Sequence, residues 1–169
     1  EFVRDKDAIM SCALLAEAAA YAKDQGMTMY EQLLDIYKEF GLYREKLISV
    51  VKKGKSGAEE IQQMMKGFRE NPPKRINNSP VTEVMDYLDP KCLERANRKN
   101  GGIVIPKSDV MQFFTADSTK ISIRPSGTEP KIKFYFGVKG KLKNAGDFEQ
   151  VNKALDERID SIINDLKLL

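Results

Sequence analysis

The chain has 169 residues, of which 41% are hydrophobic and 31% are charged, and its formal net charge is only +3. This length suffices for one hydrophobic core and part of a second. No run of about 18 apolar residues and no signal-peptide pattern is present, so we expect a cytoplasmic protein without a membrane partner. The absence of histidine excludes histidine-based catalysis and removes the commonest zinc ligand.

Two helices are expected at the beginning of the chain. Residues 8–22 are rich in alanine and apolar on nearly every side, which is typical of a buried helix. Thr28 and Glu31 form a capping-box pattern ahead of a second helix over about 29–40. Residues 1–40 supply no partner layer for this apolar surface, so we expect the two helices to be the end of a domain.

Two short polar patterns suggest ligand sites, but structural roles explain them more simply. Asp5 and Asp7 precede the first helix, where acidic side chains stabilise the positive end of the helix dipole, so we do not expect them to bind a metal. The lysine- and glycine-rich residues 53–57 lack the spacing of a nucleotide phosphate loop. We interpret Ser56 instead as the N-terminal cap of a helix over about 57–70.

From residue 43 onward the pattern indicates an α+β domain. A run rich in β-branched residues over 43–52 predicts a strand ahead of the helix at 57–70. Five further strands are expected, separated by turn residues such as Asn100-Gly101-Gly102, at 81–88, 103–105, 110–115, 119–124 and 131–138. A last helix from Asp147 to about 167 has one apolar stripe and should cover the sheet. We expect both helices on one face of the sheet, which leaves the other face open for a ligand.

The connection between the last two predicted strands is the most informative segment of the chain. Alternating apolar residues predict that 119–124 and 131–138 pair as a hairpin with Arg124 pointing away from the core. The segment reads Arg124-Pro125-Ser126-Gly127-Thr128-Glu129-Pro130. A guanidinium fork, two hydroxyls and a glycine that lets backbone N–H groups approach an anion are the components of a phosphate site.

Basic residues gather around this connection. Seven cations and the single acid Glu129 lie between Lys120 and Lys143, so we expect an electropositive surface. The alternative is that the lysines only keep the outer face of a sheet in solution.

The segment from Arg124 to Phe134 resembles the C-terminal phosphate-binding signature of the α-D-phosphohexomutases, the phosphoglucomutase and phosphomannomutase family. Residues 2–8 are similar to the segment after the sugar-recognition loop of the family's third domain, and 68–73 also match. The resemblance implies that residues 1–40 are the C-terminal helices of domain 3. It implies that 41–169 form domain 4, with a fold that resembles the TATA-binding-protein-like arrangement of sheet and helices.

Each site residue is carried over by its position in the signature. The resemblance implies that Arg124 donates charge-assisted hydrogen bonds to the phosphate of a hexose phosphate substrate. It implies that Ser126 and Thr128 add hydroxyl donors and that Gly127 lets the backbone approach the phosphate. Lys133 stands where some members of the family have a second cation directed at the phosphate.

The family moves a phosphoryl group between the 1- and 6-hydroxyls of a hexose through a phosphoserine, with Mg²⁺ and glucose 1,6-bisphosphate. We find no catalytic-serine loop, aspartate-rich magnesium loop or sugar-recognition loop in this sequence. The resemblance therefore implies that this chain has no catalytic residue or metal ligand and is inactive alone. The full-length protein would be an isomerase-class intramolecular phosphotransferase, completed by upstream domains.

Two other functions stay open. A basic sheet face with Tyr135 could bind nucleic acid, as sheet platforms do. Phe134 and Phe136 are expected on the apolar face, however, and the net charge is modest, so we expect no nucleic-acid partner. The remaining alternative is a purely structural domain.

Overall fold

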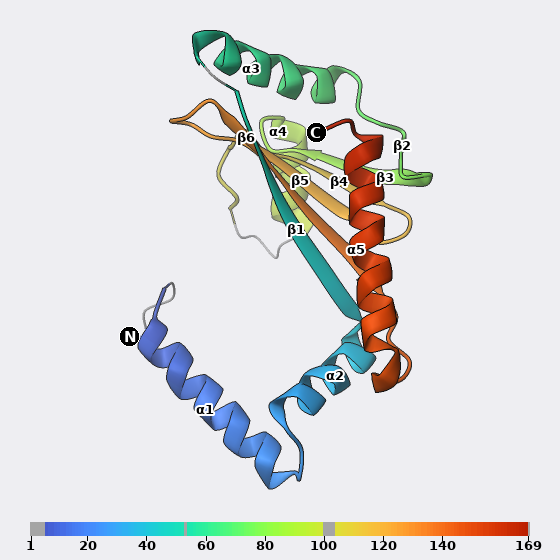
Figure 1. Cartoon of the computed structure of the whole chain (residues 1–169). Helices are drawn as coiled ribbons and strands as arrows, with labels where there is room; N and C mark the ends of the chain where they lie inside the picture. The colour runs from blue at the N-terminus through green and yellow to red at the C-terminus, as the bar shows by residue number, and fades with distance from the viewer. Residues whose placement is uncertain (1–5, 53, 100–103, 169) are drawn as a thin grey trace. The chain divides into compact units, whose positions relative to one another are not determined.

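A computed structural model of the chain describes residues 6–52, 54–99 and 104–168. Its elements, labelled in Figure 1, are α1 (Ala8–Asp24), α2 (Met29–Phe40), β1 (Leu42–Val51), α3 (Gly54–Glu70), β2 (Arg75–Ile76), β3 (Ser79–Asp86), α4 (Pro90–Lys99), β4 (Met111–Thr115), β5 (Lys120–Pro125), β6 (Lys131–Gly140), the short 3-10 helix η1 (Ala145–Asp147) and α5 (Phe148–Asp165). Among the described residues, no helix combines the length and the apolar character needed to cross a membrane.

The predicted α+β class is confirmed, and most of the predicted elements are present. The strand predicted at 103–105 is wrong, because residues 104 and 105 have no regular structure; residue 103 and the predicted turn at 100–102 lie outside the described residues. The short strand β2 and the helix α4 were not predicted. Among the described side chains of α4, only Cys92 and Ala96, one turn apart, are buried, and two small residues give a weak apolar stripe.

Six strands form one sheet in the order β1-β6-β5-β4-β3-β2, and β2 to β6 are joined by antiparallel pairing. The register places Phe113 opposite Ile121 and Ile121 opposite Phe136. Residues directly opposite each other in an antiparallel sheet share a face, so these buried side chains form one apolar face. The helix α3 packs on this face through Phe68, whose ring lies 5.9 Å from that of Phe113 and 6.3 Å from that of Phe134.

The helix α4 packs against the other face of the sheet. Met85, opposite Gln112 in the register, forms a buried cluster with Cys92 and Ala96 of α4, and Phe114 packs against it. Figure 1 shows α4 behind the strands and α5 in front of them. The face predicted to be open for a ligand is therefore covered at β3 and β4 and remains exposed along β5, β6 and β1.

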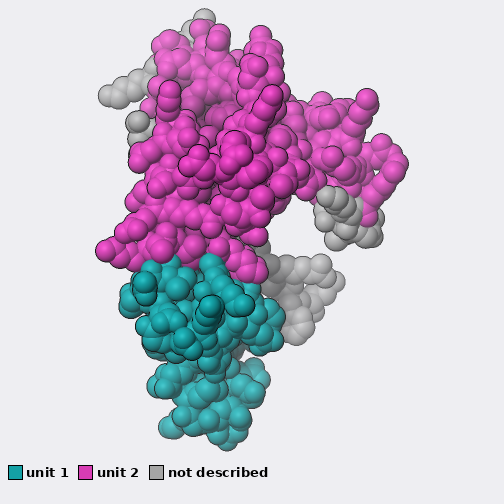
Figure 2. Space-filling view, turned by 90° about the vertical axis from the view of Figure 1, so that its right-hand side faces the viewer, with its two compact units in different colours: residues 1–42, 140–151 teal, residues 43–139, 152–169 magenta. Residues whose placement is uncertain are grey.

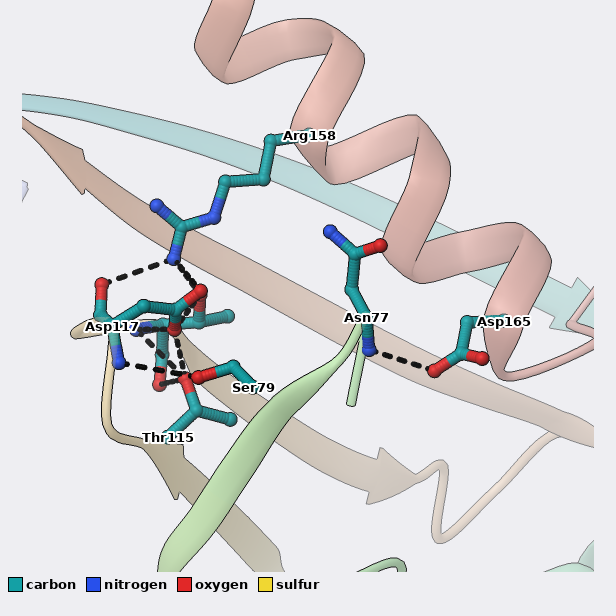
Figure 3. Close-up of polar contacts among 7 residues, drawn as sticks. Asn77, Ser79, Thr115, Asp117, Arg158 and Asp165 are labelled. Atoms are coloured by element: carbon teal, nitrogen blue, oxygen red, sulfur yellow. Dashed lines mark hydrogen bonds and ion pairs between the residues drawn. The ribbon is translucent and has the colours of Figure 1, made fainter. Parts of the chain in front are cut away.

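The turn between β4 and β5 anchors the helix α5 (Figure 3). Arg158 of α5 forms an ion pair with the Asp117 carboxylate and donates hydrogen bonds to the Asp117 backbone oxygen at 3.0 Å and to the Thr119 hydroxyl at 2.5 Å. The same carboxylate accepts hydrogen bonds from the hydroxyls of Thr115 and Thr119. The polar groups of this turn therefore bond to one another and to α5.

Further polar contacts hold α5 along its length. Near its end, the Asp165 carboxylate accepts a hydrogen bond of 2.8 Å from the Asn77 N–H, as Figure 3 shows. Two ion pairs of 2.6 Å join β1 to α5, Arg44 with Asp156 and Lys46 with Asp160.

The chain divides into two compact units, coloured separately in Figure 2: residues 1–42 with 140–151, and residues 43–139 with 152–169. In the first unit α1 contacts α2, and the capping box of Thr28 and Glu31 is confirmed. The Asp7 carboxylate caps α1 by accepting from the Met10 N–H at 2.9 Å; Asp5 lies outside the described residues. The predicted domain boundary after residue 40 stays a prediction.

The prediction of a buried helix at 8–22 is wrong for the described chain. Only Ala22 of α1 is buried, and the side chain of Ile9 is 86% exposed. The reason is that the described residues supply no layer over the apolar sides of this helix, as the sequence had indicated for residues 1–40.

Candidate functional site

The β5–β6 loop, residues 126–130, has a backbone held from both sides. Arg124 lies opposite Lys133 in the register and Pro125 lies opposite Ile132, which confirms the predicted hairpin. The Ser126 N–H donates to the Lys131 oxygen at 2.8 Å. The Lys52 N–H, just after β1, donates to the Pro130 oxygen at 2.9 Å. These bonds fix where the loop leaves the sheet.

Two predicted cations lie together at the base of the loop. Arg124 is exposed, as predicted, and Lys133 is half-buried on the same face, because directly opposed residues share a face. Their strand neighbours Ile123 and Phe134 are fully buried on the opposite face. No hydrogen bond or ion pair from either cation to another described residue is found, so both are available to an anion.

The hydroxyls and the glycine of the loop face outward. The Ser126 oxygen accepts only a long hydrogen bond of 3.5 Å from the Thr128 N–H. Gly127 is exposed, and a Cβ atom built on it would meet nothing within 4 Å. The backbone of Gly127 is not in the left-handed region, where φ is positive. Neither backbone strain nor packing in the described chain therefore requires a glycine here. The missing side chain leaves the space over the loop backbone open.

The one acid of the loop has a partner within the loop. Glu129 forms an ion pair with Lys131, and the hydrogen bond and charge of this lysine lower the pKa of the Glu129 carboxyl. The charge of Lys133 lowers this pKa to a lesser degree. Lys131 is the ion-pair partner of Glu129, whereas Arg124 and Lys133 form no ion pair with a described residue.

A hollow of about 480 Å³ lies beside the loop, on the side of α3. It is lined by residues 125–130 and by Gly54, Ala58, Ile61, Gln62 and Asp109. Sequence reasoning missed the α3 and Asp109 contributions. The spacing of Ala58, Ile61 and Gln62 does predict that they share one face of the helix. It does not predict which loop that face lies against.

The start of α3 corrects one prediction. The helix begins at Gly54, so Ser56 lies within its first turn and is not its N-terminal cap; Lys53 lies outside the described residues. A Cβ atom on Gly57 would come within 2.7 Å of the Lys52 backbone. This glycine lets α3 begin close to the end of β1, and Gly54 thereby reaches the hollow beside the loop.

Asp109 is held in place by Arg69 at the end of α3. Arg69 forms an ion pair with Asp109 and a second one of 3.0 Å with Asp86 of β3. Burial opposes the charge of Arg69, but the bonds to the two carboxylates outweigh burial and raise its pKa. The cation is thus fixed between two acids, and it fixes Asp109 at the rim of the hollow.

Other site chemistries find little support in the described residues. They contain no group of three or more Cys, Asp or Glu side chains placed to hold a metal ion. Phe134 and Phe136 are at most 2% exposed and Tyr135 is 39% exposed, so few of the sheet aromatics are available for stacking on bases.

Known proteins with sequences similar to this chain are phosphoglucomutases. No protein-family model matches the chain. A phosphoglucomutase of Staphylococcus haemolyticus is 35% identical over 153 residues, 90% of this chain and 27% of the relative. A phosphoglucomutase of Staphylococcus aureus is 35% identical over 158 residues, 94% of this chain and 28% of the relative. The predicted resemblance to the phosphoglucomutases is confirmed.

A solved structure agrees on the fold. The exocytosis-sensitive phosphoprotein pp63/parafusin, a phosphoglucomutase from Paramecium in its open form, aligns with a TM-score of 0.50 at 14% identity. The alignment covers 95% of this chain and 28% of that structure. The chain spans about a quarter of the length of the phosphoglucomutases that it matches.

Proposed function

We propose that the chain is the C-terminal part of a phosphohexomutase and that its β5–β6 loop binds the non-transferring phosphate of a hexose phosphate. Residues 1–40 would end the third domain, and 41–169 would form the fourth, TATA-binding-protein-like domain. One observation carries the proposal: the seven-residue signature connects two paired strands and has an exposed Arg124 directly opposite a second cation, Lys133, on the same face of the sheet.

Phosphate binding follows from the chemistry of these groups. The Arg124 guanidinium donates paired hydrogen bonds to two phosphate oxygens, and Lys133 adds a second positive charge. Ser126 and Thr128 add hydroxyl donors, and the open space over Gly127 lets the phosphate approach the backbone N–H groups. Holding this phosphate fixes the distant reacting hydroxyl of the sugar, which lowers the entropic part of the barrier.

The reaction itself belongs to the rest of the proposed enzyme. The full-length protein would be a phosphoglucomutase or phosphomannomutase that transfers phosphate between the 1- and 6-positions, with glucose 1,6-bisphosphate as intermediate. The described residues contain no group of three or more Cys, Asp or Glu side chains placed to hold a metal ion. In this proposal the phosphoserine and the Mg²⁺ ligands belong to upstream domains, and this chain alone is expected to be inactive.

Ligand titration tests the proposal directly. The chain is titrated with glucose 6-phosphate, glucose 1,6-bisphosphate and a single-stranded oligonucleotide at two salt concentrations, while backbone amides are followed by NMR. We expect the amides of Arg124 and of residues 126–129 to shift with both sugar phosphates. Shifts of these amides with the oligonucleotide alone would instead indicate a nucleic-acid-binding module.

Arg124 gives the sharpest mutational test. Arg124→Ala is expected to weaken glucose 6-phosphate binding about tenfold to a hundredfold, because a charge-assisted hydrogen bond is worth about 1.5–3 kcal/mol. Arg124→Lys keeps the charge but loses the fork, so its loss should be intermediate. Lys141→Ala removes an exposed cation outside the loop and serves as the control. Equal affinity of Arg124→Ala and the unchanged chain would leave a structural domain as the better description.

A further inference from the structure

We infer that the hollow between the β5–β6 loop and α3 receives the hydroxyl-bearing ring of the sugar phosphate, and that Gln62 and Asp109 bind its hydroxyls. This inference rests on the proposed function and adds to it a sugar-binding role for α3. It gives this chain a part in distinguishing a sugar phosphate from a bare phosphate.

The two sides of the loop carry different charged groups. Arg124 and Lys133, on the exposed sheet face, form no ion pair with a described residue. Among the described residues, the charged ones that line the hollow are Asp109 and Glu129, and each is paired with a cation, Arg69 and Lys131. Paired carboxylates offer a phosphate dianion no attraction but still accept hydrogen bonds from hydroxyls. A hexose phosphate has the same division, with a dianion at one end and neutral hydroxyls at the other.

The lining of the hollow suits a pyranose ring. Ala58, Ile61 and Gln62 lie at i, i+3 and i+4 and therefore share one face of α3. The exposed Ala58 offers apolar surface to ring carbons, and the Gln62 amide offers a donor and an acceptor to hydroxyls. Ile61 is 4% exposed and forms the floor of this face. The volume of about 480 Å³ lies within the roughly 300–1,000 Å³ range of small-molecule pockets.

Both polar groups are placed to act on a ligand. Gln62 is exposed, and no hydrogen bond from its side chain to another described residue is found. The side chain of Asp109 is 46% exposed and is oriented by its ion pair with Arg69. A carboxylate that is fixed from one side keeps free lone pairs on the other, so it can accept from a sugar hydroxyl without reorganising.

The experiment compares two ligands on one pair of variants. Binding of glucose 6-phosphate and of inorganic phosphate is measured by calorimetry for the unchanged chain, Gln62→Ala and Gln63→Ala. Gln63 is the exposed neighbour on α3 that does not line the hollow, so it is the matched control. We expect Gln62→Ala to weaken glucose 6-phosphate binding about fivefold and to leave inorganic phosphate binding unchanged. Gln63→Ala should change neither affinity.

A second measurement locates the ring without a variant. The backbone amides of Ala58 and Gln62 should shift in NMR spectra with glucose 6-phosphate but not with inorganic phosphate, whereas loop amides should shift with both. If both ligands move the loop amides but the α3 amides stay still and Gln62→Ala behaves like Gln63→Ala, the sugar-binding role of α3 is wrong and the phosphate loop stands. If neither ligand moves the loop amides, the proposed function is wrong, and this inference is wrong with it.

Discussion

The β4–β5 turn and the β5–β6 loop connect strands of the same sheet and contain similar polar side chains. The side chains of the two connections differ in their hydrogen bonds and ion pairs. In the β4–β5 turn, Asp117 accepts hydrogen bonds from two threonine hydroxyls and pairs with Arg158. The threonines are 6% and 2% exposed. In the β5–β6 hairpin, Arg124 at the end of β5 and Thr128 of the loop form no side-chain hydrogen bond or ion pair with a described residue, and both are exposed.

We interpret this as the difference between a structural connection and the proposed binding loop. Polar groups that are buried and bonded to one another fix an element in place, because breaking them leaves unsatisfied groups behind. Exposed polar groups on a backbone that is held at both ends cost little in the free chain and remain available to a ligand. The two connections should therefore respond oppositely to mutation: one should lose stability, and the other should lose affinity.

The largest effect on stability is expected from Arg158→Ala. This change leaves Asp117 and Thr119 without their cation, and removing one member of a partly buried polar network should lower the free energy of unfolding by about 3 kcal/mol. Urea denaturation measures the loss. Arg98→Ala breaks an exposed pair with Glu94 and is the matched control, with an expected change of about 0.5 kcal/mol or less.

The same variant should keep its affinity for a sugar phosphate. The folded fraction of Arg158→Ala should bind glucose 6-phosphate as the unchanged chain does, because the β4–β5 turn contributes no residue to the hollow beside the β5–β6 loop. A selective loss of affinity without a loss of stability would contradict the structural role of this turn.

A smaller effect is expected from the protonation of Asp117. Burial opposes the charge of this carboxylate, but its bonds to Thr115, Thr119 and Arg158 outweigh burial and lower its pKa below the ordinary value of 3.8. A lowered pKa in the folded state means that the stabilisation is fully present above the ordinary value and is lost as the pH falls through the folded-state pKa. Urea midpoints should therefore fall as the pH is lowered below about 4.

Asp117→Asn isolates this contribution. The variant should be less stable at pH 7 and should show a weaker fall in stability below about pH 4. Glu129→Gln tests the acid of the other connection, which is exposed and pairs with Lys131, and its pH profile should stay closer to that of the unchanged chain. Identical pH profiles for Asp117→Asn and the unchanged chain would rule out Asp117 as the source.

The smallest effect is expected from Gly127→Ala. The added methyl group meets nothing in the described chain, so stability should change by about 0.5 kcal/mol or less. It occupies the space over the loop, and glucose 6-phosphate affinity should fall about threefold because the backbone is harder to reach. Gly146→Ala also adds a methyl group in open space and should leave affinity unchanged. Unchanged affinity in Gly127→Ala would mean that the ligand does not approach this backbone.

The strand pattern predicted the geometry of the loop well. Alternation in 119–124 and 131–138 gave the pairing and the exposure of Arg124, because the period of two in a strand decides which face a residue joins. The helices of the first unit were located almost to the residue, since Thr28 and Glu31 mark a start by a local hydrogen-bonding pattern.

Contacts between distant segments could not be predicted in the same way. Arg158 and Asp117 are 41 residues apart, and no local pattern joins a helix face to a particular turn. Gln62 lines the hollow because α3 packs on the sheet through Phe68, and Asp109 lines it from another segment that pairs with Arg69 of α3. The helix α4 was missed because its buried side is made of small residues, and burial rather than periodicity defines it.

The facing of Arg124 and Lys133 has a consequence for the free chain. Like charges directly opposite each other on paired strands repel, so the end of this hairpin is less stable without an anion than with one. A phosphate bound between them favours the folded hairpin by mass action, and the melting temperature should rise with phosphate concentration. The repulsion stored at the base of the loop thus makes the thermal stability of the chain a reporter of its own ligand.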